Sequence, residues 1–221
     1  MPVRVDLRSW PRRAHLELFR AFADPHFLVV SEVQAGALLQ ACRARGLGAF
    51  APLLYATVRA TNDEEALRLR LHGDELWLHP VVHPSFTAKV EAPPGPPAPG
   101  CDLPLFGYVG APYTPDFAAF SAGVSAAAAG AHADVRATAG APRPDVVYVS
   151  SLPWRRFSGL KHAMADPATD CVPRLMWGRA APDGALDLSL QVHHGLADGG
   201  HVARWFDRVQ ALLDDPAWLD P

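Results

Sequence analysis

The stretch "QVHHGLADGGH", from Gln191 to His201, places three histidines and one aspartate at the junction of a strand and a helix. The residues before it alternate as in a strand that breaks at Gly195, and an amphipathic helix follows from about His201. Glycines on both sides of such a junction can hold a side chain rigidly at the mouth of a cleft. The cluster could serve as a metal site, a proton-transfer site, or an ordinary strand end.

The metal interpretation is the weaker of the two functional ones. His194, Asp198 and His201 offer nitrogen and oxygen ligands. However, adjacent histidines on a strand point to opposite faces, and no second Cys or His cluster has ligand spacing. We therefore expect no metal. Proton transfer needs only one histidine, with a nearby aspartate to orient it or fix the loop. The spacing to Asp198 favours His194, whereas His193 fits a hydrogen-bonded core histidine.

Composition bounds the remaining function classes. The 221 residues are 49% hydrophobic and 19% charged, with a formal net charge of −3, which fits one compact domain over 1–221. No large positive field attracts nucleic acid or anionic lipid, and no signal peptide or run of eighteen apolar residues is visible. We expect a cytoplasmic protein. Cys42, Cys101 and Cys171 lie far apart and indicate reduced thiols.

Outward from the junction, the pattern predicts a mixed α+β fold, a sandwich of sheet and helices. The expected strands are 3–7, 26–33, 67–71, 75–79, 85–91, 145–154 with a turn at its end, 172–180 and 185–194, and the expected helices are 11–24, 35–45, 50–61, 113–135 and 201–215. The three strands between 67 and 91 are expected to form an antiparallel run. The Pro-rich stretch 92–100 is expected to be a solvated loop.

Four stretches together resemble a known family. "HHGLADG" resembles the HHxxxDG motif of CoA-dependent acyltransferases, which several acyltransferase families share. "VDLRSWPRRAHLELFR" resembles the N-terminal signature of the type A chloramphenicol acetyltransferases, "GDELWLHPVVHPSFT" their central strands, and "VSSLPW" their S-x-L-P-W stretch. The resemblance covers nearly the full length in the expected order. It implies a two-layer fold in which helices pack against a mixed sheet.

The resemblance also implies a mechanism. His194 would be the general base that takes a proton from a primary hydroxyl, which then attacks the thioester of acetyl-CoA directly. Ser150 would donate a hydrogen bond to the oxyanion, and Asp198 would pair with Arg12 to hold the loop in place. The expected activity is O-acetylation of chloramphenicol, an antibiotic-resistance function. The alternatives are a different hydroxyl acceptor, or a weakly active or non-catalytic binder of the same ligand.

The ligand contacts follow from the same resemblance. Chloramphenicol or a similar acceptor would contact Leu18, Phe19, Ala23, Pro25, Phe27 and Phe106, and acetyl-CoA would lie near Trp154, Arg179 and Met176. Ala23 is smaller than the leucine usual in the family, and Pro25 replaces a cysteine. Met176 stands where the family has a threonine that helps to hold an ordered water. The family implies a homotrimer whose acceptor pocket faces His194 of a neighbouring subunit.

Overall fold

The computed structural model describes residues 1–90, 105–131 and 143–220 of the chain. The expected Pro-rich loop at 92–100, Cys101 and the last residues of the expected helix 113–135 lie outside the described residues. Cys42 and Cys171 are buried free thiols. Within the described residues, no helix is long and apolar enough to cross a membrane.

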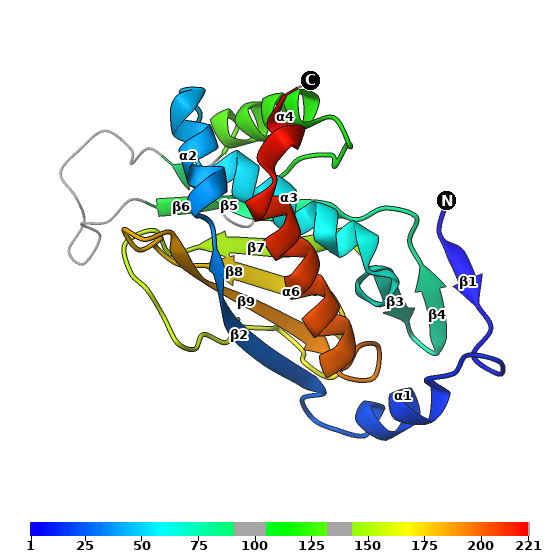
Figure 1. Cartoon of the computed structure of the whole chain (residues 1–221). Coiled ribbons are helices and arrows are strands. Elements are labelled where there is room, and N and C mark those ends of the chain that lie inside the picture. The colour runs from blue at the N-terminus through cyan, green and yellow to red at the C-terminus, as the bar shows by residue number, and fades with distance from the viewer. Residues whose placement is uncertain (91–104, 132–142, 221) are drawn as a thin grey trace.

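A mixed sheet of six strands forms the centre of the molecule (Figure 1). Across the sheet, the strands are β2 (His26–Gln34), β9 (Ala185–His193), β8 (Arg174–Trp177), β7 (Val146–Ser151), β5 (His83–Val90) and β6 (Leu105–Gly110). β7 runs parallel to both β5 and β8, and the other pairs are antiparallel. The expected α+β class with a mixed sheet is confirmed.

A smaller sheet of three strands, β1 (Val3–Val5), β4 (Glu75–Leu78) and β3 (Leu69–His72), lies beside it. The expected antiparallel run from 67 to 91 is therefore wrong in one respect, because its third strand, β5, belongs to the six-stranded sheet. After β4 the chain is diverted: the Arg68 guanidinium donates to the His79 carbonyl at 2.8 Å. Asn62 Oδ1 then accepts from the Val82 amide at 2.8 Å, which directs the chain into β5.

Helices cover one face of the large sheet (Figure 1). They are α2 (Gly36–Ala44), α3 (Phe50–Asp63), α4 (Phe117–Ala129) and α6 (Gly199–Asp214), with short 3-10 turns at Glu65–Arg68 and Pro216–Leu219. The alternation of the strands sends every second side chain toward these helices. On β9 the core-facing residues are Leu186, Leu188, Leu190 and Val192.

Helix α1 (Arg13–Arg20) is shorter than the expected 11–24 and lies apart from the other helices, next to the small sheet (Figure 1). Its one buried residue, Leu16, packs in a second core cluster with Leu69, Leu76 and Leu196. This cluster joins α1, the small sheet and the loop after β9. It therefore couples the N-terminal segment to the junction that the motif occupies.

The other face of the large sheet is partly covered by the connection between β7 and β8. Arg156 in this connection forms hydrogen bonds with Asp187 of β9 at 2.7 and 2.9 Å. The His162 amide donates to Gln191 Oε1 at 3.1 Å. Gln191 is consequently buried although it points away from the helices.

Candidate active site

His194 is held at the end of β9 by backbone hydrogen bonds. Its amide donates to the Pro25 carbonyl at 2.8 Å, in the segment between α1 and β2. The amides of Leu196 and Ala197 both donate to the His193 carbonyl, at 3.0 and 3.1 Å, so the chain turns tightly as it leaves the strand. The position of the His194 backbone is therefore fixed from two sides.

The His194 imidazole is oriented by one hydrogen bond and two aromatic rings. Nδ1 lies 3.2 Å from the Ala197 carbonyl oxygen. Because a carbonyl can only accept, this contact places the proton on Nδ1 and leaves the Nε2 lone pair free. The ring stacks on Phe19 at a centroid distance of 4.1 Å and an angle of 15°, and Phe27 lies 4.5 Å away. A half-buried imidazole in this tautomer presents Nε2 as a suitable base.

Asp198 joins the start of α6 to the N-terminal segment. Its Oδ1 accepts from the amides of Gly200 and His201 at 3.0 and 3.4 Å, which caps the helix. Its Oδ2 pairs with the Arg12 guanidinium, whose other nitrogen donates to the His194 carbonyl at 3.2 Å. Although burial opposes ionisation, the hydrogen bond from His201 and the charge of Arg12 hold the pKa of Asp198 well below its usual range.

His201 had no role expected from the sequence, and the structure gives it one. Its Nδ1 lies 2.7 Å from Asp198 Oδ1 and 3.2 Å from the Asp198 amide nitrogen, so the ring is held against both the side chain and the backbone of the N-cap residue. These contacts form a capping box, with a histidine in the place usually taken by Glu or Gln. The D-G-G-H spacing, an N-cap residue followed three positions later by a polar side chain, could have revealed it.

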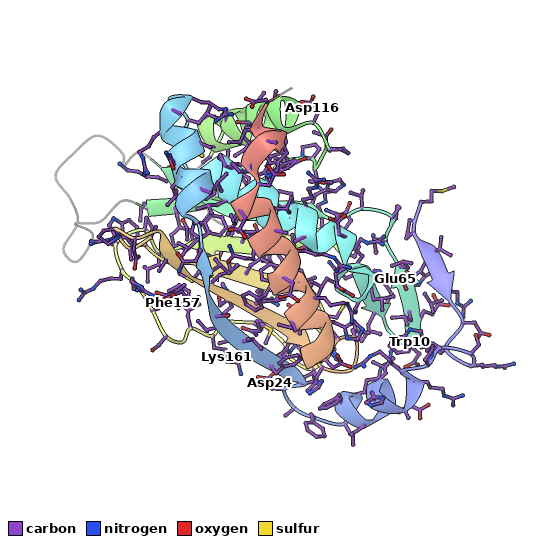
Figure 2. The ribbon with its side chains drawn as sticks, in the orientation of Figure 1. Trp10, Asp24, Glu65, Asp116, Phe157 and Lys161 are labelled. Atoms are coloured by element: carbon purple, nitrogen blue, oxygen red, sulfur yellow. The ribbon has the colours of Figure 1, made fainter. Side chains whose placement is uncertain are left out.

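Two buried histidines lie behind His194. The rings of His193 and His26 meet edge to face at 5.5 Å, and each has a buried Nε2 without a hydrogen-bond partner. Burial lowers the pKa of His193 to about 4. His26 is held through Nδ1 by Asp24 at 3.1 Å. Asp24 also pairs with Lys161 of the β7–β8 connection, and Figure 2 shows the two side by side near the start of β2.

Ser150 lies far from His194 within one chain. Ser150 of β7 pairs with Met176 of β8, which pairs with Ser189 of β9. His194 comes five residues after Ser189. With a rise of about 3.3 Å per residue and about 4.8 Å between strands, the two Cα atoms are separated by roughly 19 Å. In Figure 1 the C-terminal ends of β7 and β9 accordingly lie at opposite ends of the sheet.

Two cavities meet at Ser150, and both also touch Thr87 and Phe106. The first, which we name the Tyr148 cavity, has a volume of about 470 Å³ and reaches Tyr148, His162, Asp170 and Arg174. The second, which we name the Trp154 cavity, has a volume of about 590 Å³ and reaches Phe50, Phe86, Lys89 and Trp154. A group held at Ser150 can therefore be approached from two directions.

The expected ligand-binding residues fall into two groups. Leu18, Phe19, Ala23, Pro25 and Phe27 gather around His194 or on the helix and turn before it, and Leu18 is 56% exposed. Phe106 lies at the other end of the sheet, beside Ser150. Trp154 lines the Trp154 cavity and is 69% exposed. Met176 is buried next to Ser150, while Arg179 is exposed and lines neither cavity.

Tyr148, His162, Asp170 and Arg174 were not predicted from the sequence. Tyr148 precedes Ser150 by two residues, so it points to the same face of the sheet, and this alternation is a signal that could have identified it. In the described part of the chain, no three His, Cys, Asp or Glu side chains come together in an arrangement that could hold a metal ion.

Comparison with known proteins shows the family to which the chain belongs. A family model described as chloramphenicol acetyltransferase matches residues 2–210. The chloramphenicol acetyltransferase of Streptomyces acrimycini is 35% identical over 228 residues, which cover 99% of this chain and 97% of the relative. The chain belongs to the chloramphenicol acetyltransferase family. Chloramphenicol acetyltransferase 2 of Escherichia coli is 27% identical, with 96% of this chain and 97% of the relative aligned.

Solved structures support the fold of this chloramphenicol acetyltransferase-like acyltransferase. A chloramphenicol acetyltransferase structure aligns with a TM-score of 0.81 at 23% identity and covers 96% of this chain and 100% of that chain. The cubic core of the pyruvate dehydrogenase multienzyme complex aligns with a TM-score of 0.61 at 19% identity, over 94% of this chain and 88% of that one. Family membership implies acetyl-CoA as the co-substrate.

Proposed function

We propose that this protein transfers the acetyl group of acetyl-CoA to the primary hydroxyl of chloramphenicol or a similar acceptor, and so confers resistance to the antibiotic. The observation that carries the proposal is the state of His194. Its Nδ1–H is directed at the Ala197 carbonyl, and its ring stacks on Phe19 and contacts the tilted ring of Phe27, so Nε2 is presented as a base.

The reaction proceeds without an acyl-enzyme. His194 Nε2 takes the proton of the acceptor hydroxyl while the hydroxyl oxygen attacks the thioester carbonyl carbon. Ser150 Oγ donates a hydrogen bond to the oxyanion that develops on the carbonyl oxygen. When the tetrahedral intermediate collapses, the carbon–sulfur bond breaks and the CoA sulfur takes the proton back from Nε2. The products are the acetate ester and free CoA.

The Trp154 cavity is the place we assign to the thioester-bearing arm of acetyl-CoA. It reaches Ser150, its lining includes Phe50 and Phe86, and Lys89 supplies a cation for an anionic ligand. Phe106 and Thr87 separate this arm from the acceptor in the Tyr148 cavity, because both cavities include them. The two substrates would thus meet at Ser150 from opposite sides.

The site we propose is completed by a second copy of the chain. A hydroxyl between the base and the thioester must lie within hydrogen-bond reach of His194 and also close to Ser150. The separation of roughly 19 Å within one chain excludes this, since strand geometry fixes both residues on one rigid sheet. We infer that His194 of one subunit faces Ser150 of its neighbour, in a homotrimer closed by cyclic symmetry.

A thiol-release assay with acetyl-CoA and chloramphenicol tests the proposal. Wild-type protein should release CoA, and the acetylated product should be identified by mass. His194→Ala should lower turnover by about 10²- to 10⁴-fold, the usual contribution of a general base. His15→Ala, at an exposed position of α1, is the matched control.

A substrate control separates acetyl transfer from slow hydrolysis of acetyl-CoA. An analogue in which fluorine replaces the primary hydroxyl should give no release above the rate without acceptor. If folded wild-type protein binds chloramphenicol in calorimetry but releases no CoA with it, the protein is a binder and the proposal is wrong.

A further inference from the structure

We propose that the acceptor of this enzyme carries a neutral hydrogen-bond-accepting group, which Tyr148 and Arg174 bind at the far end of the Tyr148 cavity. The inference rests on the proposed function, because it names the chemistry of the acceptor for that same site. It predicts which acceptors the enzyme prefers, according to the polar group at the end of the acceptor far from the reacting hydroxyl.

The far end of the cavity is polar and built into the sheet. Tyr148 precedes Ser150 by two residues on β7 and pairs with Arg174 on β8. The Arg174 guanidinium lies over the Tyr148 ring, with its carbon 5.1 Å from the ring centroid. Two residues of strand correspond to about 7 Å, so this end is about one phenyl-ring length or more from the group held at Ser150.

Donors for a ligand remain free at this end. Arg174 gives three hydrogen bonds, at 3.2 and 2.5 Å to Asp170 and at 3.0 Å to the Val172 carbonyl. A guanidinium has five N–H donors, so two remain. Among the described residues the Tyr148 hydroxyl has no hydrogen-bond partner within reach, and burial raises its pKa, which keeps it a donor.

The charge at this end is balanced. Asp170 and Arg174 form an ion pair, with 23% and 7% of their side chains exposed. His162, which lies at the same end, has a buried Nε2 without a partner, and burial lowers its pKa to about 4, so it is neutral at pH 7. An anion would meet the Asp170 carboxylate without a net positive charge to hold it. A neutral acceptor group, such as a sulfonyl, amide or hydroxyl oxygen, fits better than a carboxylate.

Three acceptors that share the propanediol amide but differ at the para position of the ring test this. They carry hydrogen, a nitro group or a methylsulfonyl group, in order of increasing hydrogen-bond-acceptor strength. We expect kcat/KM to rise in that order, and Tyr148→Phe to reduce the sulfonyl-over-hydrogen preference by about 5- to 10-fold, the contribution of one hydrogen bond. Tyr113→Phe, outside the cavity, is the matched control.

A second variant tests the ion pair without leaving a buried charge unpaired. Asp170→Leu combined with Arg174→Met replaces both partners together, which a folded protein tolerates better than removal of one. Its folding is checked by thermal denaturation. The double variant should reverse the preference, so that the para-hydrogen acceptor becomes better than the sulfonyl one.

The outcomes separate this inference from the proposed function. If wild-type protein acetylates all three acceptors with the same kcat/KM, and the variants change the three kcat/KM values by the same factor, the inference is wrong and the proposed function stands. If no acceptor releases CoA, the proposed function fails, and calorimetry with the sulfonyl analogue then decides the inference. Binding weakened 5-fold or more by Tyr148→Phe would support it, and unchanged binding would overturn it.

Discussion

Arg12 and Asp198, which are 186 residues apart in the sequence, form an ion pair that connects the segment before α1 to the first turn of α6. The same guanidinium also donates to the His194 carbonyl. One arginine therefore holds both the aspartate of the motif and the backbone of the proposed base. The Arg12 side chain is 16% exposed, so water competes little for these contacts.

Asp198→Asn should lower activity more than stability. Asparagine is as good an N-cap as aspartate, so α6 keeps its start, whereas the ion pair to Arg12 is lost. A displacement of His194 by about 1 Å can reduce turnover by on the order of 10²-fold. We expect kcat to fall by about that factor while Tm changes by a few degrees at most. Kinetics and thermal denaturation on the same preparation check it.

A comparison of two neighbouring arginines provides the control. Arg12→Lys keeps the charge but cannot span both Asp198 and the His194 carbonyl, and it should be nearly as inactive as Asp198→Asn. Arg13→Lys affects only an exposed pair with Glu17 and should behave as wild type. Equal activity of the two lysine variants would show that the fork of Arg12 is not needed.

Ser150→Ala and His194→Ala should complement each other. Ser150→Ala should lose about 10²- to 10³-fold in kcat, as expected for one oxyanion donor, and His194→Ala should be at least as inactive. When the two chains are unfolded together and refolded as mixed oligomers, about a quarter of wild-type activity should return, because each proposed site takes one residue from each of two subunits. Mixed but unexchanged proteins should stay inactive.

Two results would contradict a site shared between subunits. If light scattering shows mixed oligomers and no activity returns, Ser150 and His194 do not act across an interface. If the protein is a monomer with full activity, the composite site is wrong as well.

Stability should fall as the pH drops from about 6.5 to about 4. Burial lowers the pKa values of His193 and His162 to about 4 in the folded chain, whereas an unfolded histidine has a pKa near 6.5. Between these pH values the unfolded state binds more protons than the folded state, so the free energy of unfolding decreases as the pH falls. The decrease is roughly 3 kcal/mol for His193 alone. Asp24, whose pKa the Lys161 hydrogen bond lowers to about 2, contributes a loss only below pH 4.

Denaturant unfolding at pH 7.5 and pH 5 measures this effect. His193→Gln retains an acceptor for the Gly195 amide, which donates to His193 Nδ1 at 3.1 Å, and it should flatten the pH dependence. His15→Gln, at an exposed position, should leave the slope of the wild type unchanged. A wild-type slope that is flat over this range would mean that His193 protonates freely in the folded state.

Local patterns predicted the elements that carry their own signals. β9 alternates over nine residues and α6 begins at a side-chain cap, so both were placed within a few residues. β6 was missed because "LFGYVG" contains two glycines and follows a Pro-rich stretch, and its strand conformation depends on pairing with β5. The membership of β5 in the large sheet likewise depends on the long-range contact between Asn62 and Val82.

Part of the candidate site likewise lies in local motifs, and part is assembled by long-range contacts. His194, Asp198, Arg12 and Ser150 lie in motifs that resemble a family, and the structure brings the first three together. Tyr148, Arg174, Asp170 and His162 form the polar end of their cavity across two strands and the connection between them. No short stretch of sequence contains that group, so the sequence did not reveal the polar end of the cavity.

Gly195→Ala should reduce both activity and stability, whereas Gly199→Ala should not. A Cβ at Gly195 would lie 2.9 Å from His193 Cε1 and 3.0 Å from Leu16 Cδ1, and both neighbours are buried and tightly packed. Relief of this overlap must move the His193 ring or the turn that carries His194, at a typical cost of about 1–3 kcal/mol.

At Gly199, in the first turn of α6, a Cβ meets nothing within 4 Å, and alanine favours the helix. Thermal denaturation and kcat of the two variants therefore test whether the space around Gly195 fixes the position of the base, and equal values for both would contradict it.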